Sequence, residues 1–135
     1  MAAVGIFGAG WVGLVTGGSF AELGHDVVIR DVQSERIEAL RDGRVPIHEP
    51  GLPELLERNR ERLTFTLDAA DLAGCETLFV CVGTPPTYSG DADLSAVWTA
   101  IVRSRSLPRC FSSLATTRRF CSSFTSITAE RSWKW

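Results

Sequence analysis

The chain of 135 residues is 44% hydrophobic and carries a formal net charge of −2, which is the composition of one ordinary soluble domain. No apolar run approaches the roughly 20 residues of a membrane span, and no basic segment precedes the first apolar run, so we expect neither a membrane partner nor a signal peptide. The two histidines and four cysteines form no cluster with metal-ligand spacing. We therefore expect no metal site, and free thiols in a reducing, cytoplasmic compartment.

The chain opens with an apolar run, a glycine-rich turn and an amphipathic segment. Residues 4–7 are predicted to form a strand and residues 14–23 a helix. Between them the pattern G-x-G-x-x-G is made of Gly8, Ala9, Gly10, Trp11, Val12 and Gly13. In this context the first glycine allows a sharp turn, the second lets a pyrophosphate approach the backbone, and the third lets the helix pack close to the strand. The N–H groups and dipole at the helix start favour phosphates, so we expect these residues to bind a dinucleotide.

An acidic residue follows at the spacing that this motif requires. Residues 27–30 are predicted to form a second strand, which ends at Asp31, 18 residues after Gly13. In dinucleotide-binding units an acidic residue about 20 residues on accepts a hydrogen bond from the adenosine ribose. A carboxylate there repels a 2′-phosphate, so the expected cofactor is NAD and not NADP, although Arg30 and Arg36 weaken that preference.

The middle of the chain is expected to contribute two helices and a strand. Ser34 is the predicted N-cap of a short helix. Residues 45–52 should be irregular because prolines and a glycine interrupt them. Pro53 suits the first turn of a helix that runs towards Arg62. An alternating strand at residues 63–66 and one turn of helix follow.

The last predicted strand is a continuous apolar run at residues 77–82, as expected for a parallel strand covered on both faces. Gly83, Thr84 and Pro85 stop it. A further helix should begin with Asp93 as its N-cap. Its apolar stripe is formed by Leu94, Val97, Trp98 and Ile101.

Alternation of strands and helices in this order predicts the α/β class, with a Rossmann-type doubly wound parallel sheet and right-handed crossovers. The expected strand order is 3-2-1-4, and a ligand belongs at the carboxyl ends of the first and fourth strands, where the order reverses. The glycine turn ends the first strand. Residues 83–85 end the fourth, so we expect them to close over the cofactor, although they could merely terminate the strand.

The composition changes abruptly near residue 101. Residues 1–101 carry seven basic and 15 acidic residues, a net charge of −8, whereas residues 102–135 carry seven basic residues and one acidic residue, a net charge of +6. All 12 glycines lie at or before Gly90. We interpret residues 1–101 as an incomplete NAD-binding domain and residues 102–135 as a basic Ser/Arg-rich tail, and we hypothesise that the tail is an out-of-frame translation. A genuine tail with an acidic partner is the alternative, but its scattered basic residues match no groove-reading motif, so we expect no nucleic-acid partner.

Four motifs occur in order along the chain. They are G-A-G-W-V-G-L-V-T-G from Gly8, A-E-L-G-H-D-V from Ala21, P-x-x-E-P-G-L from Pro46 to Leu52, and V-G-T-P-P from Val82 to Pro86. Together they resemble the N-terminal NAD-binding domain of the UDP-glucose/GDP-mannose dehydrogenase family, and most of all its UDP-glucose-oxidising members. This resemblance implies an enzyme that oxidises the 6-hydroxymethyl group of a nucleotide sugar to a carboxylate with two NAD, through a thioester on a cysteine.

The resemblance also implies roles for single residues. Arg36 would lie beside the adenine end of the cofactor, and residues 82–86 would line it, with Thr84 reaching it. The E-P-G-L run is a hallmark of the family, but we assign it no chemistry. The complete expected cofactor site is Gly8, Ala9, Gly10, Trp11, Val12, Gly13, Asp31, Arg36, Val82, Gly83, Thr84 and Pro85.

After Ile101 the resemblance stops, and the catalytic threonine, glutamate, lysine, asparagine and cysteine of the family have no counterpart. Cys110-Phe111 copies the order of a family pair, but no glycine loop precedes it. We therefore assign no catalytic residue and expect no turnover by the chain alone, with a UDP-sugar substrate only in a full-length protein.

Two alternatives stay open. The chain could be a non-catalytic NAD- or nucleotide-binding module, or the NAD domain of another Rossmann dehydrogenase. The E-P-G-L and V-G-T-P-P motifs argue against the second alternative. The sequence leaves the oligomeric state open.

Overall fold

The structure, a computed structural model, describes residues 2–105. Its helices and strands are β1 (Ala3–Phe7), α1 (Trp11–Glu22), β2 (Asp26–Arg30), α2 (Ser34–Arg41), α3 (Leu52–Arg58), β3 (Leu63–Thr66), β4 (Thr77–Val80) and α4 (Ser95–Arg105). Two short 3₁₀ helices, η1 (Arg60–Arg62) and η2 (Ala69–Gly74), flank β3. The tail hypothesis and the Cys110-Phe111 pair fall almost wholly outside the described residues.

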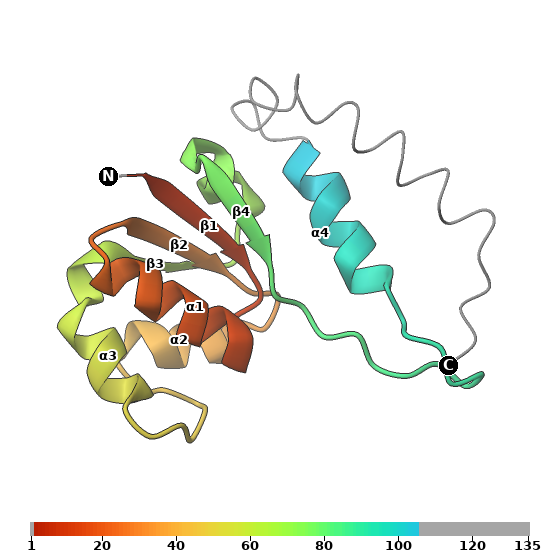
Figure 1. The fold of residues 1–135 in the computed structure, drawn as a ribbon, viewed down its shortest axis with the longest axis horizontal. Coiled ribbons are helices and arrows are strands. Elements are labelled where there is room, and N and C mark those ends of the chain that lie inside the picture. The colour runs from red at the N-terminus through yellow and green to blue at the C-terminus, as the bar shows by residue number, and fades with distance from the viewer. Residues whose placement is uncertain (1, 106–135) are drawn as a thin grey trace.

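The four strands form one parallel sheet in the order β3-β2-β1-β4 (Figure 1). This confirms the predicted doubly wound order. β1 lies between β2 and β4, with Val4 opposite both Val27 and Thr77. Because all strands run the same way, their carboxyl ends meet at one edge of the sheet. The glycine turn after β1 therefore lies beside the ends of β2 and β4.

The alternation of side chains along the strands divides the core into two clusters. Val4 and Ile6 of β1 pack with Val27 and Ile29 of β2, and the leucines of α1, α2 and α3 cover them. Phe7 points to the opposite face, where residues of η2 and one residue of α4 cover it. Successive residues of a strand face opposite sides of the sheet, so this two-sided burial explains why β1 is apolar throughout.

Several element boundaries differ from the predicted ones, and α1 begins at Trp11 and not at residue 14. β4 ends at Val80, and not at residue 82, because β1 turns away after Phe7 and the Cys81 N–H is the last to reach it, at 2.7 Å from the Phe7 carbonyl oxygen. Ser34 is the first residue of α2 and not its cap. The helix that contains Pro53 ends at Arg58, and the short helix η1 completes the run to residue 62.

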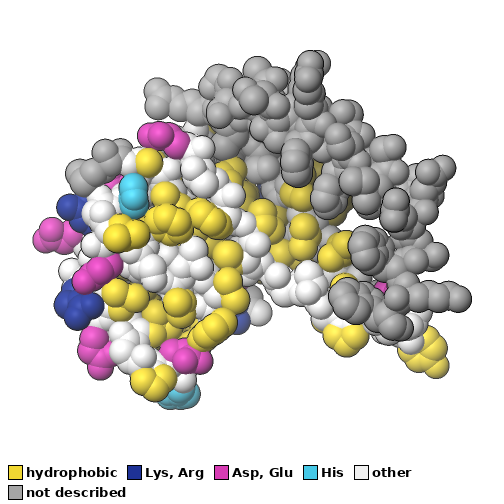
Figure 2. All heavy atoms as spheres, in the orientation of Figure 1, with side chains coloured by type: hydrophobic (Ala, Val, Ile, Leu, Met, Phe, Trp, Pro, Cys, Tyr) yellow, Lys and Arg dark blue, Asp and Glu magenta, His cyan; other side chains and the backbone are white. Residues whose placement is uncertain are grey.

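The apolar stripe predicted on α4 is largely exposed. Trp98 is 64% exposed and Leu94 57%, whereas Ala100 on the side facing the sheet is buried. Figure 2 shows hydrophobic side chains on the surface of this part of the molecule. The Asp93 carboxylate accepts a hydrogen bond from the N–H of Ser95 at 2.9 Å, but α4 begins at Ser95, so Asp93 lies one residue before the N-cap position that was predicted for it. The helix therefore forms where expected, but its apolar side contacts little.

Candidate functional site

The glycine turn brings three strand ends together, and each glycine meets a different constraint. Gly8 has φ +103°, which only glycine adopts without strain, and a Cβ there would lie 2.4 Å from the Cys81 carbonyl oxygen. A Cβ on Gly13 would lie 1.8 Å from the Gly8 carbonyl oxygen. A Cβ on Gly10 would meet nothing within 4 Å. Two glycines thus permit close packing, and the third faces open space.

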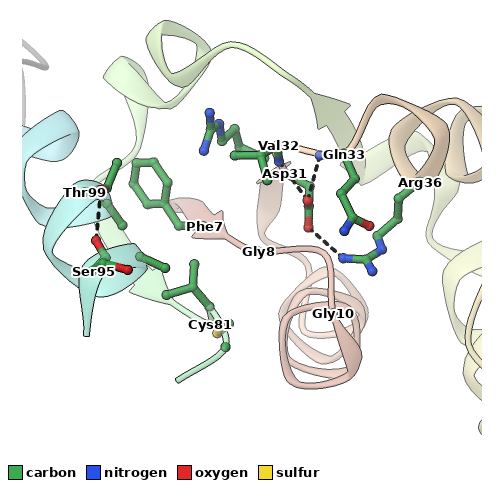
Figure 3. A pocket seen from close by; sticks show the side chains of 15 residues that line it. Phe7, Gly8, Gly10, Asp31, Val32, Gln33, Arg36, Cys81, Ser95 and Thr99 are labelled. Atoms are coloured by element: carbon green, nitrogen blue, oxygen red, sulfur yellow. Dashed lines mark hydrogen bonds and ion pairs between the residues drawn. The ribbon is translucent and has the colours of Figure 1, made fainter. Parts of the chain in front are cut away.

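That open space belongs to a cavity of about 370 Å³ at the carboxyl ends of β1, β2 and β4. Its lining comes from the glycine turn, the residues after β2, the residues after β4, and α4 (Figure 3). The residues are Phe7, Gly8, Gly10, Arg30, Asp31, Val32, Gln33, Arg36, Cys81, Val82, Gly83, Ser95, Ala96, Thr99 and Ala100. The cavity therefore lies at the point where the strand order reverses, as predicted.

Asp31 is held in this cavity by four donors and is only 6% exposed. Its Oδ1 accepts from the N–H of Val32 at 2.7 Å and of Gln33 at 3.0 Å, and its Oδ2 accepts from the N–H of Ala9 at 2.7 Å. The Arg36 guanidinium also contacts Oδ2, at 3.2 Å. Desolvation raises the pKa of Asp31, but the backbone N–H groups and Arg36 outweigh it and lower the pKa overall. The carboxylate is therefore charged at neutral pH.

Two other groups in the cavity have shifted pKa values. Burial, and then the charge of Arg103, lower the pKa of Arg30, whose Nε donates to the Leu67 carbonyl oxygen at 3.1 Å. Burial raises the pKa of the Cys81 thiol. A raised thiol pKa keeps the sulfur protonated at neutral pH, and the thiolate is the nucleophilic form, so Cys81 is poorly suited to covalent catalysis.

The fold and this geometry can be compared with known proteins. The family model for the NAD binding domain of the UDP-glucose/GDP-mannose dehydrogenase family matches residues 2–107. The chain belongs to this family. It is 42% identical over 100 residues to UDP-glucose 6-dehydrogenase TuaD of Bacillus subtilis, an alignment that covers 72% of this chain and 22% of TuaD. It is 40% identical over 99 residues to GDP-mannose 6-dehydrogenase of Pseudomonas aeruginosa, covering 71% of this chain and 23% of that protein.

Solved structures of the family have the same fold. A UDP-glucose dehydrogenase from Pyrobaculum islandicum superposes with a TM-score of 0.73 at 43% identity, over 76% of this chain and 24% of that one. A UDP-D-ManNAc dehydrogenase from Pyrococcus horikoshii gives a TM-score of 0.74 at 33% identity, over 78% of this chain and 25% of that one. The chain thus spans about a quarter or less of the length of these dehydrogenases.

Within this NAD-binding domain, the structure brings half of the expected site residues to the cavity. Those that line it are Gly8, Gly10, Asp31, Arg36, Val82 and Gly83. Those that do not line it are Ala9, Trp11, Val12, Gly13, Thr84 and Pro85. Ala9 and Gly13 are buried in the packing of the turn, whereas Trp11 is 52% exposed at the start of α1. Thr84 and Pro85 lie in the exposed loop that leads away from β4.

One wall of the cavity, supplied by α4, was not predicted from the sequence. Ser95, Ala96, Thr99 and Ala100 line the cavity, and they share one side of the helix because residues three or four apart are neighbours there. Their side chains are small, so they leave room for a ligand between α4 and β1. The run of small residues opposite the apolar stripe is the signal that could have identified this wall.

Residues 2–105 hold no group of three or more histidine, cysteine or acidic side chains placed to bind a metal ion. Within the same residues, no helix is long and apolar enough to cross a membrane.

Proposed function

We propose that the cavity at the carboxyl ends of β1, β2 and β4 is the NAD site of this family member. The observation that carries the proposal is the open space at Gly10, directly before the first turn of α1. The first N–H groups of a helix have no partner within the helix and carry its positive partial charge, so they suit a pyrophosphate. The space that a Cβ would fill is the space that a phosphate needs.

The other cavity residues fit the remaining parts of the same cofactor. The charged Asp31 carboxylate suits the adenosine ribose hydroxyls and disfavours a 2′-phosphate. Arg36 beside it, and the turn at Val82 and Gly83, would then contact the adenosine half. NAD bound here would supply a hydride acceptor, while these residues bind and orient it.

For the protein's overall role we propose the cofactor-binding part of a UDP-glucose 6-dehydrogenase-like enzyme. The similarity to UDP-glucose and GDP-mannose dehydrogenases supports this reaction class, in which the sugar hydroxymethyl group becomes a carboxylate. Among the described residues, Cys75 is buried and Cys81 is half-buried. Neither of these two is suited to hold a thioester. Because the family's catalytic residues also have no counterpart in the sequence, we expect this chain alone to give no NADH with UDP-glucose. A reducing, cytoplasmic compartment stays a prediction.

The experiment is a calorimetric titration of NAD into the 135-residue chain and into Gly10→Val. We expect the parent to bind and the variant to lose measurable affinity, because the new side chain occupies the phosphate position. Gly74→Val is the matched control, since a Cβ on Gly74 also meets nothing within 4 Å and this residue lies outside the cavity. If the parent and Gly10→Val bind NAD with equal affinity, the NAD site does not lie in this cavity.

A further inference from the structure

One oxygen of the Asp31 carboxylate makes only local contacts, within the turn that follows β2. Oδ1 accepts hydrogen bonds from the N–H groups of Val32 and Gln33, the next two residues along the chain. Aspartate side chains commonly bond the backbone one or two residues on, and such bonds shape the start of a loop. These contacts explain the turn after β2, but they involve only one of the two carboxylate oxygens.

The second oxygen reaches a different segment. Oδ2 accepts a hydrogen bond from the N–H of Ala9 at 2.7 Å, in a buried contact that spans 22 residues of sequence. Ala9 lies between the first two glycines of the turn. The preceding N–H, that of Gly8, donates to the Arg30 carbonyl oxygen at 2.7 Å. Two successive amides of the glycine turn are therefore bound to the end of β2, and only the bond to Asp31 involves a charged side chain.

This hydrogen bond is expected to be strong because it is short and buried and its acceptor is ionised. Hydrogen bonds to an ionised acceptor contribute about twice as much as neutral ones, and the loss of the acceptor would leave the N–H of Ala9 buried and unsatisfied. The Ala9 side chain is fully buried, so the residue has little freedom to find water or another partner. The position of Ala9 thus depends on the charge of Asp31.

Ala9 in turn precedes the part of the turn that faces the cavity. Gly10 is the N-cap residue of α1, and its carbonyl oxygen accepts the N–H of Leu14 at 2.9 Å. A shift of Ala9 would therefore move Gly10 and the free N–H groups of the first helical turn together. A phosphate site made of backbone N–H groups depends on such placement, because those groups have no side-chain freedom with which to compensate.

We propose that Asp31 is a positioning residue for the glycine turn in addition to its contact with the adenosine ribose. Its carboxylate holds the N–H of Ala9 and so keeps Gly10 and the start of α1 in place for a diphosphate that Asp31 itself does not touch. This inference rests on the proposed NAD site. It gives one side chain a role in binding both the ribose and the diphosphate of the cofactor.

The test combines one substitution with one change of ligand. In Asp31→Asn the single carbonyl oxygen can accept from Val32 and Gln33, but the amide NH₂ then faces the N–H of Ala9, and that bond is lost. The parent and Asp31→Asn are titrated with ADP and with 2′,3′-dideoxy-ADP, which lacks the ribose hydroxyls. We expect the substitution to lower the affinity for ADP by about tenfold or more. The affinity for 2′,3′-dideoxy-ADP should still fall by about threefold or more. If the parent and the variant bind 2′,3′-dideoxy-ADP equally, Asp31 acts through the ribose alone and the inference is wrong.

A second measurement needs no ligand. Amide hydrogen exchange should be slow at Ala9 in the parent and faster by about tenfold or more in Asp31→Asn. The amide of Ile29 in β2 is the control, and unchanged exchange there shows that the variant is folded. Equal exchange at Ala9 in both proteins would overturn the inference. Failure of the parent to bind either nucleotide would contradict the proposed NAD site instead, and the exchange measurement would then decide whether Asp31 holds the turn.

Discussion

At the scale of single residues, we propose that the charge of Asp31 determines which cofactor the site accepts. We expect Asp31→Ala to lower the affinity for NAD by about tenfold or more, because the ribose hydroxyls lose a charged acceptor. The same change should reduce the preference for NAD over NADP, since it removes the repulsion of a 2′-phosphate and leaves Arg36 beside the site. Paired titrations of both cofactors measure this. If NADP already binds the parent as well as NAD does, the assigned role of Asp31 is wrong.

From the sequence, Asp31 could be predicted as the acidic residue of the cofactor site, but only some of the residues around it could be. Spacing from the glycine motif identifies the acidic residue, because both lie on consecutive strands whose ends meet. Its contact with Ala9 and the approach of α4 were not predicted, since each depends on how segments far apart in sequence pack together. Arg30 was recognised only as a charge that weakens the preference for NAD, yet it lines the cavity.

At the scale of elements, the close approach of α1 to β1 depends on Gly13. A Cβ there would lie 1.8 Å from a backbone oxygen of the turn, and backbone cannot rotate aside as a side chain can. We expect Gly13→Val to reduce the free energy of unfolding by about 3 kcal/mol, which urea denaturation measures. The control is Gly74→Val, where the same side chain enters open space. Equal stability of the two variants would contradict this packing argument.

The element predictions were accurate where local pattern decides and less so where packing does. Pro53 lies in the first turn of α3, and η2 forms after β3, as the turn and capping residues indicate. The stop of β4 at Val80 depends instead on where its neighbour β1 ends. The exposure of Trp98 could not be inferred either, because an apolar stripe shows which side of a helix seeks burial and not whether anything covers it.

At the scale of the whole molecule, the exposed side of α4 and the half-buried strand β4 lie at one edge of the sheet. Among residues 2–105 no strand pairs with the outer edge of β4, and exposed apolar surface next to such an edge favours association between molecules. We expect the chain to self-associate with rising concentration, and Trp98→Lys to reduce this. Sedimentation velocity measures the effect, with Tyr88→Lys as the control because Tyr88 is fully exposed in the loop before α4. A reversible, cooperative melt of a monomer well above room temperature would count against the prediction.

The abrupt change in composition also concerns the whole chain. We propose that residues 102–135 are translated out of frame, because glycine and acidic residues become scarce together there. The nucleotide sequence across and beyond these codons tests this. We expect another reading frame to encode a serine-threonine-valine loop and, later, a glycine-flanked cysteine. If no frame encodes them, the basic tail is a genuine part of the protein.

The placement of NAD in the cavity is tested most directly by mapping its binding site on the folded chain. Amide chemical shifts of the parent are recorded by NMR with and without NAD. We expect the largest changes at Gly8, Gly10 and Gly83, which line the cavity, and little change at Gly51 and Gly74, which lie outside it. Large changes confined to residues outside the cavity, or no change at saturating NAD, would contradict the placement of the cofactor at the carboxyl ends of β1, β2 and β4.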